Sequence, residues 1–224
     1  MSRKRTHRLA AASRRFAAVS LIILVAILLT SCGGGPTPIR PPSINASAAG
    51  REAMDQYDTN GDGQVAGAEL EKAPGLKAAL RRLDSNGDEA VDADEVAERV
   101  KAWQAAGIGL MSFGFTVTLN GSRLANADVT FEPEEFLGDN VKPASGTTNS
   151  YGGGSPTIAP QDRPDPTWPS GMQLGLYKVK ISKVIGGNET IPARYNEATV
   201  LAQEVAQDVS EIANNRVVFA LSSN

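Results

Sequence analysis

The residues of this sequence that could do chemistry together are oxygen donors spaced two positions apart. Asp58, Asn60 and Asp62 alternate along a short polar segment, Gly63 follows directly, and Glu69 lies a few residues further on. Alternate side-chain oxygens converge when such a segment curls around one point, and Gly63 allows the positive φ that turns the chain sharply. An all-oxygen set of this kind favours coordination of a hard metal cation.

The same spacing begins again at Asp84, which lies 26 residues after Asp58. Glu89 stands where the first segment has Gly63, and a non-glycine residue in the left-handed conformation costs about 1 kcal/mol. We therefore expect the second segment to bind an ion more weakly or to be slightly reshaped. The additional carboxylate of Asp92 compensates for this in part.

Both segments resemble the twelve-residue loop of the EF-hand family. The resemblance implies two Ca²⁺ ions, of which the first has the better site, with affinities of about 10⁻⁴ to 10⁻³ M as in extracellular modules. The implied ligands are Asp58, Asn60, Asp62, the backbone of Gln64 and Glu69 in the first loop, and Asp84, Asn86, Asp88, the backbone of Ala90, Asp92 and Glu95 in the second. The alternative is a pair of solvated turns in which Asp and Asn cap helices.

Apolar residues recur at helical spacing on both sides of the two loops. These residues are Met54 and Tyr57, then Leu76, Leu80 and Leu83, and finally Val96, Val100 and Trp103. Val65 and Val91 occupy position 8 of their loops, where paired loops meet in a short β bridge. The pattern predicts a small helical EF-hand pair over residues 49–106.

After Gly107 the apolar period shortens towards 2, which is typical of strands. We expect strands over 113–119, 175–184 and 216–221, and a return strand over 127–131 after the tight-turn pair Asn120-Gly121. Residues 138–172 form a long insertion without a clear period. The predicted fold class is α+β in separate modules, with an antiparallel β-sandwich of about seven strands over residues 109–224.

Four segments of this second module resemble the transthyretin-like, carboxypeptidase-regulatory-like β-sandwich domain of planctomycete-type bacterial lipoproteins. They are VTLNGSRLANADVTFEP (117–133), ASGTT (144–148), GLYKVKISKV (175–184) and IPARYN (191–196). Residues 149–173 depart from that pattern where a further strand would be expected. The resemblance implies a non-catalytic structural or interaction domain and identifies no ligand site.

The N-terminal region has the layout of a lipoprotein signal peptide over residues 1–31. Its first fifteen residues contain six Lys and Arg and no Asp or Glu, and the segment Phe16–Leu29 is uncharged and mostly apolar. The sequence Leu29-Thr-Ser-Cys32 that ends this segment resembles a bacterial lipobox. We expect Cys32 to carry a lipid that binds the membrane, with residues 32–48 as a flexible Gly/Pro/Ser-rich tether. The alternatives are an uncleaved anchor, for which the run is shorter than the roughly 20 residues needed, and ordinary secretion.

Composition narrows the function classes further. Six of the 22 Lys and Arg lie in the leader, which leaves 16 against 25 Asp and Glu, so nucleic acid is not an expected partner. The single His and single Cys, at His7 and Cys32, exclude His-dependent and Cys-dependent catalysis in the mature chain. The predicted function is a calcium-binding, lipid-anchored protein of the cell envelope whose sandwich contacts an envelope protein or glycan.

The alternative function is an extracellular hydrolase that acts on a polysaccharide or peptide. It would have to use paired carboxylates such as Glu132, Glu134 and Glu135. Because these residues flank Pro133 after a strand, our favoured interpretation places them in a solvated loop.

Overall fold

The structure is a computed structural model that describes residues 39–223. Its first element is helix α2 (Ala46–Tyr57). The helix begins at Asn45, whose Oδ1 accepts the amide of Ala48 at 3.1 Å and so satisfies one of the unpaired donors of the first turn. The carbonyls of Ser43 and Ile44 already accept side-chain hydrogen bonds from the folded body, each at 2.8 Å. The tether predicted over 32–48 is therefore wrong at its C-terminal end.

The predicted signal peptide and Cys32 lie outside the described residues. Within residues 39–223, no helix is both long enough and apolar enough to cross a bilayer.

Two three-residue strands and three helices follow α2 in the helical region. They are β1 (Gln64–Ala66), α3 (Gly67–Leu70), α4 (Pro74–Leu83), β2 (Ala90–Asp92) and α5 (Ala93–Ala105). Pro74 starts α4, where a missing N–H costs no hydrogen bond. The apolar residues expected on helical faces are buried, or partly buried in the case of Met54 and Leu80, so the predicted inward faces are confirmed.

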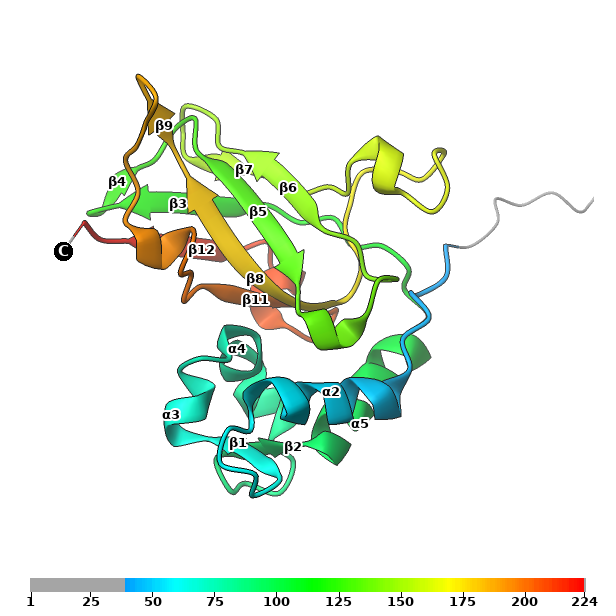
Figure 1. Cartoon of the computed structure of the whole chain (residues 1–224). Coiled ribbons are helices and arrows are strands. Elements are labelled where there is room, and N and C mark those ends of the chain that lie inside the picture. Colours follow the sequence, from blue (N-terminus) through cyan, green and yellow to red (C-terminus); the bar gives the residue numbers. More distant parts are fainter. Residues whose placement is uncertain (1–38, 224) are drawn as a thin grey trace, which may run out of the picture. The chain divides into compact units, whose positions relative to one another are not determined.

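The β region contains two main sheets (Figure 1). One has the order β11–β8–β5–β6 and is antiparallel throughout. Its strands are β5 (Asp128–Pro133), β6 (Ala144–Thr147), β8 (Gly175–Ser182) and β11 (Ala202–Val205). The other has the order β12–β3–β4, with β7 also paired to β3; its strands are β3 (Phe115–Leu119), β4 (Ser122–Arg123), β7 (Gly153–Gly154) and β12 (Val217–Leu221).

Short elements connect these strands. They are η1 (Glu135–Leu137), η2 (Pro160–Asp162), the hairpin β9 (Val184–Ile185) with β10 (Asn188–Glu189), η3 (Ala193–Tyr195) and α6 (Ser210–Ala213).

Two topological predictions were wrong. Strand β12 runs parallel to β3, with Val217 opposite Phe115 and Leu221 opposite Leu119, so the β region is not wholly antiparallel. The turn at Asn120-Gly121 leads only into the two-residue strand β4. Strand β5 crosses to the other sheet and pairs with β6 and β8, so it is not the partner of β3.

The insertion predicted over 138–172 contains regular structure. It holds β6, which extends the first sheet, and β7, which pairs with β3. Further along, Arg163 donates to the carbonyls of Ile158 and Trp168 at 3.0 and 2.9 Å and ties the Pro-rich loop together. The absence of a clear period reflects the short strands and their Gly and Ser content, since neither residue supplies an alternating apolar face.

The two sheets meet face to face through aromatic side chains. The ring of Phe131 on β5 lies 5.9 Å from that of Phe115 on β3 and 6.0 Å from that of Phe219 on β12, measured between centroids. Such tilted and edge-on aromatic pairs contribute to packing beyond the area that they bury. The core of the β region is therefore built around Phe131.

The helical region packs on the first sheet and shares its core. Helix α4 contacts β8 and β11, and α2 contacts η1, as the helices below β8 and β11 in Figure 1 illustrate. From Ile39 onward the chain forms one compact unit. The α+β class is confirmed, whereas the prediction of separate modules is wrong, because the boundary near residues 106–109 divides no independent cores.

Candidate metal centre

The first acidic loop is held in a curl by its own side-chain oxygens. Asp58 accepts the amides of Gly61 and Gly63 at 2.7 and 2.8 Å, one on each carboxylate oxygen. Asn60 Oδ1 accepts the amide of Asp62 at 2.8 Å, and Asp62 Oδ1 accepts that of the residue two positions later at 3.0 Å. The side-chain oxygens of Asp58, Asn60 and Asp62 are therefore turned towards the backbone of the loop.

Glu69 closes this loop from its far end. Its Oε1 accepts the amides of Thr59 and Asn60 at 2.8 and 3.1 Å and the hydroxyl of Thr59 at 2.9 Å, although ten residues separate Glu69 from Thr59. The hydrogen bond from the Thr59 hydroxyl is the main cause that lowers the pKa of Glu69, with further support from backbone N–H groups. Glu69 is thus ionised at neutral pH, as a cation ligand must be.

The second loop repeats these contacts 26 residues later. Asp84 accepts the amides of Gly87 and Glu89 at 2.6 and 3.0 Å, and Asn86 Oδ1 accepts that of Asp88 at 2.9 Å. Glu95 Oε1 accepts the amide and hydroxyl of Ser85 at 2.9 and 3.2 Å, as Glu69 does with Thr59. Two separate stretches of sequence therefore adopt one hydrogen-bonding pattern.

The position after the third donor is left-handed in both loops. Gly63 has φ +88° and Glu89 has φ +63°. The predicted left-handed conformation of Glu89 is confirmed, and this loop carries backbone strain that the first loop avoids.

The two loops are joined side by side. Val65 lies opposite Val91 in the antiparallel pair β1–β2, which is the predicted bridge. Gln64 Nε2 also donates to Asp88 Oδ2 at 2.8 Å, so a side chain of the first loop supports a predicted ligand of the second. The amide of Ala90 is the main cause that lowers the pKa of Asp88, and the amide groups of Asn86 and Gln64 add to it.

The remaining predicted ligands differ between the loops at the ninth position. Ala66 offers no side-chain oxygen there, and Asp92 instead caps helix α5 by accepting the amide of Glu95 at 2.8 Å. Gln64 and Ala90, whose carbonyls were predicted as ligands, both lie in the β bridge.

These donors are all oxygens, mostly anionic, and match the ligand chemistry of Ca²⁺ better than that of softer metals. In the described part of the chain, no three or more His, Cys, Asp or Glu side chains are already gathered so that they could hold an ion. The carboxylates accept hydrogen bonds from N–H groups of the loops, and several of their oxygens, such as Glu69 Oε1 and Asp84 Oδ1, accept more than one. These residues fit Ca²⁺ because their donor atoms are oxygens and because both loops present them in the same order along the chain.

Sequence reasoning missed two buried carboxylates, Glu134 and Glu204, each only 1% exposed. The interpretation of Glu132 to Glu135 as a solvated loop is wrong at Glu134, which follows β5 and is covered by the helical region. Its partners are 59 and 77 residues away, so no local pattern could reveal them. Buried and hydrogen-bonded, Glu134 is out of reach of a substrate in this conformation.

A comparison of the chain with protein families, with curated proteins and with solved structures found no match.

Proposed function

We propose that this protein is a calcium-binding protein of the cell envelope, in which residues 46–105 form an EF-hand pair. The observation that carries the proposal is the repeated set of loop hydrogen bonds at 26-residue spacing. Solvated helix-capping turns need no such repetition, nor a glutamate that reaches back ten residues in each loop.

Two Ca²⁺ ions would be held by the donors of the two loops. The first would use Asp58, Asn60, Asp62, the carbonyl of Gln64 and Glu69, and the second would use Asp84, Asn86, Asp88, the carbonyl of Ala90, Asp92 and Glu95. The ions would neutralise charge in a segment, residues 51–101, that has thirteen acidic against seven basic residues. Their role in this proposal is structural.

The calcium-binding body would be held at a membrane by a lipid on Cys32. The basic and apolar leader and the Leu-Thr-Ser-Cys sequence support this location. The β region would act without catalysis, as a structural domain or as a contact for an envelope protein or glycan, which is what its resemblance to transthyretin-like domains implies.

Isothermal titration with Ca²⁺ tests the metal sites. The protein should bind two ions, and Asp58→Ala combined with Glu69→Ala should abolish the tighter phase. Asp55→Ala is the matched control, because Asp55 is an exposed acid on α2 one turn before the loop and not a predicted ligand. No heat and no change in Trp103 fluorescence on adding Ca²⁺ to the unaltered protein would reject the proposal.

Membrane fractionation tests the location separately. Cys32→Ser should release the protein from membranes if a lipid anchors it, whereas an uncleaved apolar anchor would keep the variant bound.

A further inference from the structure

Two carboxylates of the β region lie between the sheet and the helices. Glu134 follows β5 and Glu204 lies on β11, and neither is accessible to solvent. A buried carboxylate without hydrogen-bonding partners is strongly unfavourable. Within residues 39–223, every buried side-chain oxygen and nitrogen has a partner. Docking of the helices therefore requires that the donors for these two groups arrive in the right places.

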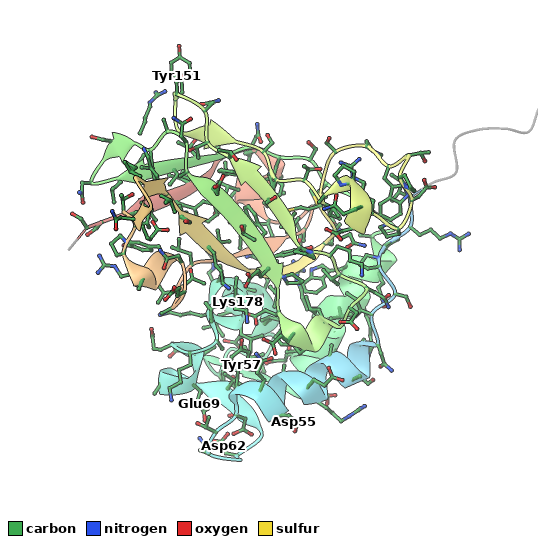
Figure 2. The ribbon with its side chains drawn as sticks, turned by 45° about the horizontal axis from the view of Figure 1, so that its top comes forward. Asp55, Tyr57, Asp62, Glu69, Tyr151 and Lys178 are labelled. Atoms are coloured by element: carbon green, nitrogen blue, oxygen red, sulfur yellow. The ribbon has the colours of Figure 1, made fainter. Side chains whose placement is uncertain are left out.

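The helical region supplies the hydrogen bonds to Glu134. Tyr57 donates its hydroxyl to Oε2 at 2.7 Å, and the amide of Gly75 donates to Oε1 at 3.0 Å. A side chain at position 75 would collide with Glu134, since an added Cβ would lie 2.3 Å from Oε1. From the β region only Lys178 approaches, at 3.9 Å. Figure 2 shows Tyr57 between the loop residues Asp62 and Glu69 and the sheet residue Lys178.

Glu204 is held in the same way by α4 and α5. Arg99 donates to Oε1 at 2.5 Å, Trp103 Nε1 donates to the same oxygen at 3.1 Å, and Arg82 pairs with Oε2. Arg99 additionally forms a two-pronged pair with Asp208, at 2.8 Å for each bond. All donors to Glu204 thus come from the helices that bracket the second loop.

Three of these donors lie close in sequence to the proposed calcium ligands. Tyr57 directly precedes Asp58, Arg82 lies two residues before Asp84, and Arg99 lies one helical turn after Glu95. The helical hydrogen bonds run into the loops, because the amides of Asp58 and Asp84 still bond to α2 and α4 at 2.9 and 2.8 Å. Any change in the orientation of an acidic loop therefore also moves a hydrogen-bond donor to Glu134 or Glu204.

The two acidic loops bring several negative charges close together. Seven of their predicted ligands are carboxylates, which repel one another unless a cation lies among them. A bound ion would hold the loop ends, and hence the three helices, in the orientation that satisfies Glu134 and Glu204.

We propose that calcium binding and docking of the helices on β8 and β11 are coupled through Glu134 and Glu204. The inference rests on the proposed calcium sites. Coupling is reciprocal, so calcium tightens the docking and intact docking contacts raise calcium affinity, each by about tenfold within the usual range of coupling strengths.

Hydrogen exchange measured alongside calcium titration tests this coupling. In the unaltered protein, calcium should slow exchange of the β8 and β11 amides about tenfold. Glu204→Gln should still bind two ions, with affinity about tenfold weaker, and exchange of β11 should no longer respond to calcium. Glu132→Gln is the matched control, because Glu132 lies on β5 and its ion pair is with Lys180 of β8, both side chains being partly exposed.

Tyr57→Phe provides a second variant that removes one hydroxyl and serves if Glu204→Gln does not fold. It should weaken calcium affinity in the same direction and uncouple β8. If the unaltered protein binds calcium while exchange of β8 and β11 stays the same, the coupling is overturned and the proposed function stands. If it binds no calcium, the proposed function itself fails.

Discussion

The hydroxyl of Tyr57 donates a hydrogen bond of 2.7 Å to Glu134, across 77 residues of sequence. The bond joins the last residue of α2 to the first residue after β5. When Glu134 is ionised, the bond belongs to the stronger, charge-assisted class. It anchors the helix that leads into the first acidic loop onto the β region.

Replacing Tyr57 by Phe should lower the free energy of unfolding by about 1.5–3 kcal/mol, because a buried carboxylate loses a hydrogen-bond donor. Urea titration followed by circular dichroism measures the change. Tyr151→Phe is the control: Tyr151 is 69% exposed, and its substitution should cost less than about 0.5 kcal/mol. Equal effects of the two substitutions would show that the bond to Glu134 contributes nothing.

Replacing Arg99 by Ala should cost about 3–5 kcal/mol, the range for breaking a buried ion pair, since Glu204 would lose the more deeply buried of its two cations. Lys77→Ala is the contrasting case. Its pair with Glu71 is solvent-exposed on both sides and should contribute about 1 kcal/mol or less. The same urea titrations compare the two variants, and a mild Arg99 variant would mean that Arg82 and Trp103 suffice for Glu204.

The stability contributed by Glu134 should fall as pH rises. Burial is the main cause that raises the pKa of Glu134 above its ordinary value of 4.5, against the opposing hydrogen bond from Tyr57 and the charge of Lys178. Above 4.5 and up to the raised pKa, the folded protein binds more protons than the unfolded chain, so this contribution is present at acidic pH and lost through that interval.

Urea titrations from acidic to neutral pH test this sign. Glu134→Gln cannot titrate, so its stability relative to the unaltered protein should improve as the pH rises. Glu132→Gln removes a charge two residues earlier, on β5, and serves as the reference. The pKa of Asp208 is lowered, mainly by its hydrogen bond from Arg99, so its own contribution should run the other way and disappear as pH falls. A stability difference for Glu134→Gln that does not depend on pH would contradict the prediction.

Substitutions at the left-handed position should change stability in opposite directions in the two loops. Glu89→Gly relieves strain and should stabilise the second loop by up to about 1 kcal/mol, whereas Gly63→Ala introduces it and should cost about 1–2 kcal/mol. Nothing lies within 4 Å of a Cβ at position 63, so that cost isolates the backbone. Glu89→Asn separates strain from charge, because Asn tolerates this conformation. Thermal unfolding without calcium measures all three.

The sequence was most informative where the structure depends on neighbouring residues. The turns at Gly63 and Glu89 and the Val65–Val91 bridge follow from patterns within twelve residues. Glu134 and its neighbour Glu135 look alike in sequence, yet the side chain of Glu135 is 80% exposed and that of Glu134 is buried. The difference arises because Glu134 accepts hydrogen bonds from helices that lie far away in the sequence.

Strand direction was also beyond local reasoning. The alternation of Val217, Phe219 and Leu221 predicts one buried face, but it is identical for a parallel and an antiparallel neighbour. The parallel pairing with β3 is set by the path of the whole intervening chain.

That pairing has a consequence for how the molecule folds. Phe115 and Val217 are partners although they lie far apart in sequence, so the sheet between them cannot form before β12 has been synthesised. Contacts of such long sequence separation slow folding, because the loop must close before any pairing energy is gained. The sheet that contains β3 therefore stays incomplete until β12 pairs with it, so the last strand in sequence, not the first, completes this sheet.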